Sequence, residues 1–431
     1  MRSPRSLILL LGAVAAIAAA VLTGGASASS GVIVVQDSSI SPTTTTIGGA
    51  SVLPTTNTVE HWHGTALNPH DGITYGFNMV GKDPSLEQTS NIPTDIIPIN
   101  VIVGGMTFSG SDVVAPTLSS PQFSLDDYTS TPFVTNSTDG KVNNGFTAGG
   151  LLSSGNTNNQ LEDATMRSQF NKQGTNYHVN LSPVTTHDPI TIVVPSGKGT
   201  LIQTGRGVIA GDINIQWWAT RIQNLNNSLG YVDPTHLPIY LTNNVMLFVG
   251  GNPANCCVIG FHGAGPVPSH TSNGPMNGSG NQRVQTWAWA SYVTPGFFGP
   301  VSAWALQDIH ALSHEVSEWA DDPFINNFVE PWLTPTAPQY GCTNVLETGD
   351  PVVAIGFAKG TNTFEQGPTP IGTQVADGFY HPEDEVLLPW FMRTAPNTTS
   401  QPVQGGTDGR YTFMGSLNPY AGFKTAATGC S

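Results

Sequence analysis

The sequence predicts an α+β fold, with a β-rich N-terminal half and a mixed α/β C-terminal core arranged around one central helix. Three observations lead to this prediction. Residues 59–204 contain short β-branched runs and few strong helical patterns. Residues 205–431 mix strand-like and helical patterns, and within them the segment 302–322 has apolar residues at clear helical spacing. The 431-residue chain is long enough for one large domain or two.

The N-terminus has the pattern of a secretory signal. Arg2 and Arg5 precede the apolar stretch Leu7–Leu22, and Ala26-Ser27-Ala28 supplies small residues at a cleavage site. We therefore expect residues 1–28 to be removed on export. A retained membrane anchor is the alternative, which the short apolar run disfavours. No other stretch predicts a membrane span, so the mature protein is expected outside the cell.

The composition after this signal is poor in charge. Residues 29–58 are rich in Ser and Thr and predict a linker. Charged residues make up 10% of the chain, and the formal net charge is -15, whereas an ordinary protein has roughly 25% charged residues. Such a surface repels itself little at low pH and suits an exported protein of an acidic habitat. No basic patch is present, which excludes nucleic acid as a partner.

The β-rich region at 59–204 is predicted to contain strands and one short helix. The run IPTDIIPINVIV is β-branched and punctuated by proline, which is typical of strands. The predicted elements are strands at Ile92–Val103, Tyr177–Leu181 and Ile190–Val194 and a helix at Glu162–Phe170.

The core at 205–431 is predicted to begin with a helix, because INIQWWATRIQNL has apolar residues at helical spacing. Strands follow, and then a Gly/Pro/Ser/Asn-rich loop at 263–280. The predicted elements are a helix at Ile213–Leu225 and strands at Leu237–Leu241, Val245–Val249, Cys257–Phe261 and Val284–Tyr292.

The central helix, predicted at Ser302–Asp322, is the best-defined element of the chain. Pro323 ends it. Its apolar stripe has the spacing i, i+4, i+7, i+11 and i+14, as expected for a helix that packs on one side. The residues of this stripe are Ala305, Ile309, Leu312, Val316 and Trp319.

The opposite side of this helix carries His310, His314 and Glu318 and no basic residue. His314 and Glu318 are four positions apart, so their side chains can converge on one metal ion. Together with Glu315 they form an H-E-x-x-E pattern, a variant of the zinc helix in which the glutamate after the first histidine is the general base. The alternatives are a chance pattern on a solvated helix and a structural ion without catalysis.

Further residues are needed to complete such a site. Glu347 and Asp350 follow the helix by about 30 residues. We expect Glu347 to bind zinc and Asp350 to support it, and the reverse assignment is the alternative. His310 lies too far along the helix to share one ion with both His314 and Glu318, so it is either an alternative ligand or a supporting residue.

Two further histidines, His262 and His381, are candidates for contacting substrate or the transition state. For each of them a hydrogen-bonded structural histidine is the competing interpretation.

Four cysteines in an exported chain predict two disulfides. Adjacent cysteines pair poorly, because disulfide geometry needs Cα atoms roughly 5.5 Å apart in a suitable orientation. We therefore expect Cys256 and Cys257 to pair with Cys342 and Cys430, in either order.

The helix resembles the active-site helix of the zincin metallopeptidases, with Glu318 in place of their second histidine. More broadly, the region from about 237 to 430 is similar to the EXORDIUM-like (phosphate-induced protein 1) family. The carrying segments are Phe248–Pro253, Cys256-Cys257, Phe261-His262, Asp322-Pro323-Phe324, Gly341-Cys342 and Cys430-Ser431. The first resemblance implies a zincin-like core with catalysis. The second implies an extracellular protein that does not require catalysis.

Together these observations predict a secreted zinc-dependent hydrolase that acts on a protein or peptide. Zinc would be held by His314, Glu318 and Glu347, with Glu315 as general base. The alternative is a non-catalytic, cell-wall-associated EXORDIUM-like protein in which any metal is structural. A third interpretation, a carbohydrate-binding module, rests only on aromatic content.

Overall fold

The computed structural model describes most of the predicted β-rich region and core. The described residues are 58–128, 131–135, 151–152, 157–203, 208–267, 283–294, 308–333, 342–353, 355–363, 378–394, 411–413 and 430. The predicted signal peptide at 1–28 and all of the predicted linker except Thr58 lie outside these residues. Within them the fold is mixed α/β and dominated by strands, which confirms the α+β class in its broad form.

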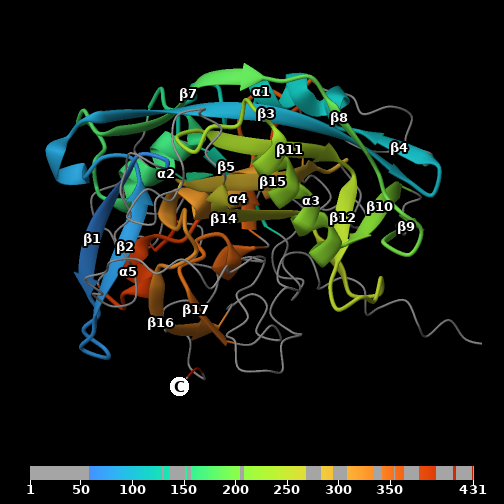
Figure 1. Cartoon of the computed structure of the whole chain (residues 1–431). Coiled ribbons are helices and arrows are strands. Elements are labelled where there is room, and N and C mark those ends of the chain that lie inside the picture. The colour runs from blue at the N-terminus through green and yellow to red at the C-terminus, as the bar shows by residue number, and fades with distance from the viewer. Residues whose placement is uncertain are drawn as a thin grey trace, which may run out of the picture.

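A seven-stranded sheet forms the centre of the molecule (Figure 1). Its path runs β14-β15-β11-β3-β4, and β7 and β8 also pair with β3. The sheet thus takes strands from both sides of residue 204. The bounds are β3 Thr89–Val103, β4 Met106–Ser109, β7 His178–Thr186, β8 Ile190–Val193, β11 Leu237–Asn243, β14 Gly260–Val267 and β15 Arg283–Tyr292.

Alternation along these strands separates two cores on the two faces of the sheet. In β3, Ile96 belongs to one apolar cluster and Ile97 to the other, and in β15 Ala288 and Trp289 divide in the same way. Both faces are buried, which explains why β3 reads as a nearly continuous apolar run. One face is covered by α3 (Ile215–Ser228) and the other by α4 (His310–Asp321).

The small residues of β15 allow α4 to approach the sheet closely. Ala288 and Ala290 face the same cluster as Leu312 and Val316 of α4, whereas Trp289 points to the α3 side. The indole N–H of Trp319 donates to Thr286 Oγ1 at 2.9 Å, so the last turn of the helix is fixed to the same strand.

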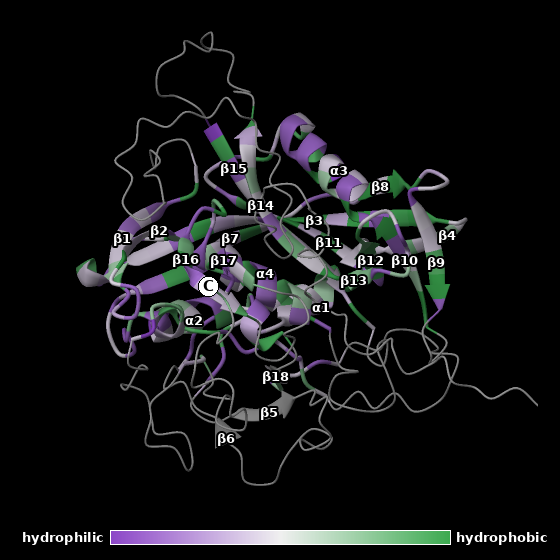
Figure 2. Ribbon diagram, turned by 90° about the horizontal axis from the view of Figure 1, so that it is seen from below, coloured by the Kyte–Doolittle hydropathy of each residue, from purple (hydrophilic) through white to green (hydrophobic). Residues whose placement is uncertain are grey.

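Helix α4 confirms the predicted apolar stripe from Leu312 to Trp319 and the predicted stop before Pro323. It begins at His310, and residues 302–307 of the predicted helix, Ala305 among them, lie outside the described residues. All twelve of its residues are buried, the polar ones included. Figure 2 shows the helix in the middle of the molecule, with strands around it. The solvated helix considered as an alternative is therefore wrong, and His314, Glu315 and Glu318 face a protein interior.

Smaller elements surround this centre. The other sheets have the strand orders β1-β2, β13-β12-β10-β9, β16-β17 and β18-β5-β6. Their strands are β1 His61–Leu67, β2 Thr74–Val80, β5 Thr131–Thr135, β6 Leu151–Leu152, β9 Gly199–Gln203, β10 Ile209–Asn214, β12 Val245–Phe248, β13 Cys256–Val258, β16 Phe328–Leu333, β17 Cys342–Val345 and β18 Ile355–Phe357. The other helices are α1 Val114–Ser119, α2 Leu161–Gln169 and α5 Leu388–Phe391, and 3-10 turns lie at Pro84–Leu86, Gly110–Val113 and Asp350–Val352.

The predicted disulfide pairing is wrong. Cys256 pairs with its neighbour Cys257, and Cys342 pairs with Cys430, so no cysteine is free. The prediction rested on the usual Cα separation of a disulfide, whereas the Cα atoms of these adjacent cysteines are 3.0 Å apart across a cis peptide bond. The second pair has a Cα separation of 5.7 Å, in the usual range.

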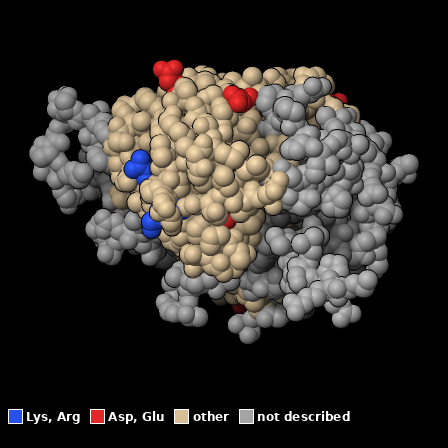
Figure 3. Space-filling view, turned by 90° about the vertical axis from the view of Figure 1, so that its right-hand side faces the viewer, with Lys and Arg blue, Asp and Glu red and all other residues tan. Residues whose placement is uncertain are grey.

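The described surface carries few charged side chains, as the composition predicts. Figure 3 shows one face on which isolated Lys, Arg, Asp and Glu residues are scattered among uncharged ones. Among the described helices, none is long and apolar enough to cross a membrane.

Candidate metal centre

Helix α4 brings the first two candidate ligands together. His314 and Glu318 are one turn apart, and His314 Nε2 lies 3.1 Å from Glu318 Oε1. Asp350 approaches the same histidine, with its Oδ1 3.8 Å from Nε2. One ligand atom from each of His314, Glu318 and Asp350 lies within 4.8 Å of the others, so these buried groups could hold a metal ion.

The turn that carries Asp350 fits closely against the helix. The backbone N–H groups of Gly349 and Asp350 both donate to Glu318 Oε1, at 3.2 Å each. A Cβ atom at position 349 would lie 2.4 Å from His314 Nδ1, so glycine is required for this approach. The turn therefore fixes the Glu318 carboxylate and delivers Asp350 to the site at the same time.

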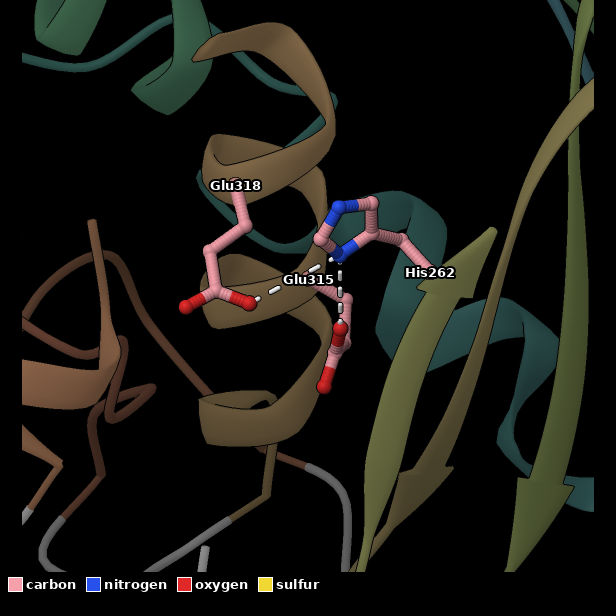
Figure 4. Close-up of side chains that lie close together, drawn as sticks. All are labelled: His262, Glu315 and Glu318. Atoms are coloured by element: carbon pink, nitrogen blue, oxygen red, sulfur yellow. Dashed lines mark hydrogen bonds and ion pairs between the residues drawn. The ribbon is translucent and has the colours of Figure 1, made fainter. Parts of the chain in front are cut away.

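A second group lies on the sheet side of α4 (Figure 4). Strand alternation turns His262 of β14 toward the helix, and its Nδ1 is 3.4 Å from Glu315 Oε2 and 3.6 Å from Glu318 Oε2. Gly260 on the same strand makes room for Glu315, because a Cβ there would lie 2.6 Å from the Glu315 Cγ. His262, Glu315 and Glu318 form a second buried group that could hold a metal ion.

Glu383 orients the two histidines of the helix. Its Oε2 lies 2.8 Å from His314 Nδ1 and 2.8 Å from His310 Nε2, and its backbone N–H donates to Ser313 Oγ. With Nδ1 engaged in this way, His314 presents Nε2 to Glu318 and Asp350. A carboxylate behind a histidine is the arrangement that usually fixes the ring of a metal ligand.

The charges of this region do not balance. Buried carboxyl groups surround three histidines, and no ion pair between the described residues joins a Lys or Arg to them. These carboxyl groups belong to Glu315, Glu318, Asp322, Glu347, Asp350, Glu383 and Glu385. An interior of this kind requires protons or bound cations to compensate the negative charge.

The pKa directions follow from burial and from this excess of acid. Burial raises the pKa of Glu347 and Asp350 well above the ordinary range, and the Glu318 carboxylate raises both further. Burial also raises the pKa of Glu315, against the opposing effect of the hydrogen bond with His262. For Glu318 the contact with His314 outweighs burial and lowers the pKa. The contacts of Glu383 with His310 and His314 likewise outweigh burial and lower its pKa, so Glu318 and Glu383 are the carboxylates of the centre that stay ionised most readily.

The other sequence candidates lie around this centre. Glu347 is fully buried beside Glu318, and no N–H or O–H donor reaches either of its oxygens. His310 contacts Glu383 and the Val353 carbonyl, which is a supporting position. His381 lies beside Asp308 just before α4, with its Nδ1 3.5 Å from Asp308 Oδ2.

Glu383 and Glu385 were not singled out in the sequence. They lie about 60 positions after the end of α4, with no periodic pattern to connect them to it. The one available signal is the acidic run Glu383-Asp384-Glu385 directly after His381 and Pro382, in a chain where charge is rare.

Comparison of the chain with protein-family models, with curated proteins and with solved structures found no match. The function is therefore argued from the site.

Proposed function

We propose that the protein is a secreted zinc-dependent hydrolase of the peptidase type. His314, Glu318 and Asp350 would hold the metal, and Glu315 would act as general base. The observation that carries the proposal is the convergence of three buried ligand atoms, from His314, Glu318 and Asp350, with a third carboxylate, that of Glu315, beside them. The predicted signal peptide and the two disulfides support secretion.

The donor set fits zinc. One imidazole nitrogen and two carboxylate oxygens are ligands that zinc accepts, and catalytic zinc sites keep three protein ligands and one open position. Both oxygens of the buried Glu347 carboxyl lack an N–H donor, so this group needs either a proton or a cation. When bound, zinc would polarise a carbonyl and lower the pKa of a coordinated water toward about 7.

Glu315 and His262 would carry out the proton transfer. Glu315 Oε1 lies 4.0 Å from His314 Nε2, close enough to accept a proton from a water beside that nitrogen and to pass it to the leaving amine. His262 would orient Glu315 through its Nδ1 contact. The raised pKa of Glu315 suits a base that must bind a proton and release it again.

The second candidate is the non-catalytic, EXORDIUM-like alternative with a structural metal. One observation favours it: the ligands are almost completely buried, with His314 6%, Glu318 3% and Asp350 3% exposed. Structural zinc sites are closed, whereas catalytic sites admit water and substrate. In this alternative the chain would bind the metal without hydrolysing anything.

The variant Glu315→Gln separates the two candidates. Wild-type and variant proteins, each loaded with one equivalent of Zn²⁺, would be assayed on an unstructured protein such as casein. We expect the variant to keep the zinc and to lose hydrolysis by at least about 100-fold, the usual contribution of a general base. Asp321→Asn is the matched control, a buried carboxyl of the same helix that contacts Gln169 and should leave hydrolysis unchanged. Wild-type protein that holds zinc and hydrolyses nothing would favour the structural alternative.

A further inference from the structure

We infer that the centre has a second cation position, formed by His262, Glu315 and Glu318, and that Glu318 bridges the two positions. This inference rests on the proposed function, because the first position is the one to which catalysis is assigned. Occupation of the second position would switch the hydrolase off.

The two oxygens of Glu318 face different histidines. Oε1 is 3.1 Å from His314 Nε2, and Oε2 is 3.6 Å from His262 Nδ1. Each oxygen therefore belongs to a different triangle of ligand atoms, one completed by Asp350 and the other by Glu315. A carboxylate that presents one oxygen to each side is able to hold two cations a few ångströms apart, as in two-metal sites with spacings of about 3.5–4 Å.

The surroundings supply the charge for a second cation. Glu347 lies beside Glu318, fully buried and with both carboxyl oxygens lacking a hydrogen-bond donor. Glu385 is a second buried carboxyl whose oxygens both lack a partner. These buried carboxyl groups form no ion pair with a Lys or Arg among the described residues. A single divalent cation would therefore compensate only part of their negative charge.

Glu315 belongs both to the second cation position and to the proposed hydrolytic reaction. The carboxylate that would accept the proton from water is the same one that completes the triangle with His262. A cation bound there takes the lone pairs of Glu315 and removes the base. Hydrolysis is therefore expected to rise with the first equivalent of metal and to fall with the second, so that the enzyme is inhibited by an excess of its own cofactor.

The test is a metal titration of the full-length mature chain. Metal-depleted wild-type protein is titrated with Zn²⁺, bound zinc is counted by elemental analysis after gel filtration, and hydrolysis is measured at each step. We expect two zinc ions per wild-type chain, maximal hydrolysis at one, and a loss of at least about tenfold at two. His262→Gln is expected to bind one zinc ion, and the control Asp321→Asn two. Should His262→Gln not fold, Glu315→Gln provides the same count, again one.

The outcomes separate this inference from the proposed function. One zinc ion per wild-type chain with hydrolysis intact overturns the second position and leaves the proposed function standing. No zinc in the wild type overturns both. Two zinc ions in His262→Gln, or hydrolysis that is unchanged by the second equivalent, overturns the assignment of His262 or Glu315 to the second position.

Discussion

Replacing Glu383 by alanine tests whether the centre depends on a residue that touches no metal. One of the two carboxylate oxygens of Glu383, Oε2, lies 2.8 Å from both His310 Nε2 and His314 Nδ1. His310 Nε2 retains the Val353 carbonyl when Glu383 is lost, whereas His314 Nδ1 has no second acceptor among its described contacts. The variant should therefore loosen His314 more than His310.

Two independent estimates agree on how much zinc-binding free energy the variant should lose. A hydrogen bond to a charged group contributes about 1.5–3 kcal/mol. Loss of a carboxylate behind a metal-bound histidine typically weakens metal binding by about 10–100-fold, which corresponds to about 1.4–2.7 kcal/mol. We expect Glu383→Ala to raise the zinc dissociation constant of the first position by about 10–100-fold.

The assay is competition for zinc with a chelator of known affinity. The matched control is Asp321→Asn, a buried carboxyl of α4 that contacts Gln169 instead of a histidine. Its effect on zinc affinity should be less than about threefold, because it orients no ligand. An unchanged zinc affinity in Glu383→Ala, or an equal loss in both variants, would refute the orienting role.

Three further predictions concern stability. Burial raises the pKa of Asp212 to about 7, so its ionisation costs folding free energy as pH rises from about 4 to 7. Asp212→Asn should therefore stabilise the protein at pH 8, by up to about 4 kcal/mol, and hardly at pH 3, as measured by urea unfolding; a gain independent of pH would contradict this. Although burial raises the pKa of Asp95, hydrogen bonds with His236 and His187 lower it overall, while Asp95 raises the pKa of His236. The carboxylate contribution is lost in acid and the histidine contribution as pH rises above about 6.5, so Asp95→Asn should destabilise most near pH 5, by roughly 1–3 kcal/mol; an equal effect at pH 5 and 8 would count against the pairing. Converting Cys342 and Cys430 to serine opens a loop with a sequence separation of 88 and should cost about 2–5 kcal/mol, whereas a melting temperature equal to that of the wild type would show that this bond contributes little.

The sequence located the central helix because periodicity is a local signal. The stripe through Leu312, Val316 and Trp319 and the stop at Pro323 are both visible in the letters, and both are confirmed. The sequence does not show what surrounds the polar face of this helix. The face with His310, His314 and Glu318 is polar enough to suggest exposure to solvent. In the structure it is buried and packs against acidic residues from 347–350 and 383–385.

The ends of some predicted helices and strands differ from those in the structure for local reasons. Ile213 and Asn214 were assigned to a helix but belong to β10, because the Asn214 side chain caps α3 by accepting the N–H of Trp217. The predicted single strand at Cys257–Phe261 is divided between β13 and β14, which lie in different sheets. The choice between Glu347 and Asp350 could not be made from spacing, because the turn at Gly349 decides which carboxylate reaches His314.

The length of β3 has a consequence for how the chain reaches its native state. This one strand pairs with β4, β7, β8 and β11, and its partner Leu237 lies about 140 positions after Thr94. Parallel pairing over such a separation requires a large loop to close before any stabilising contact forms, which makes folding slow. Until residues 237–241 arrive, β3 has an apolar edge with free backbone groups, and such edges recruit strands of other molecules. During synthesis, the newly made N-terminal half is therefore exposed to aggregation until this strand finds its partners.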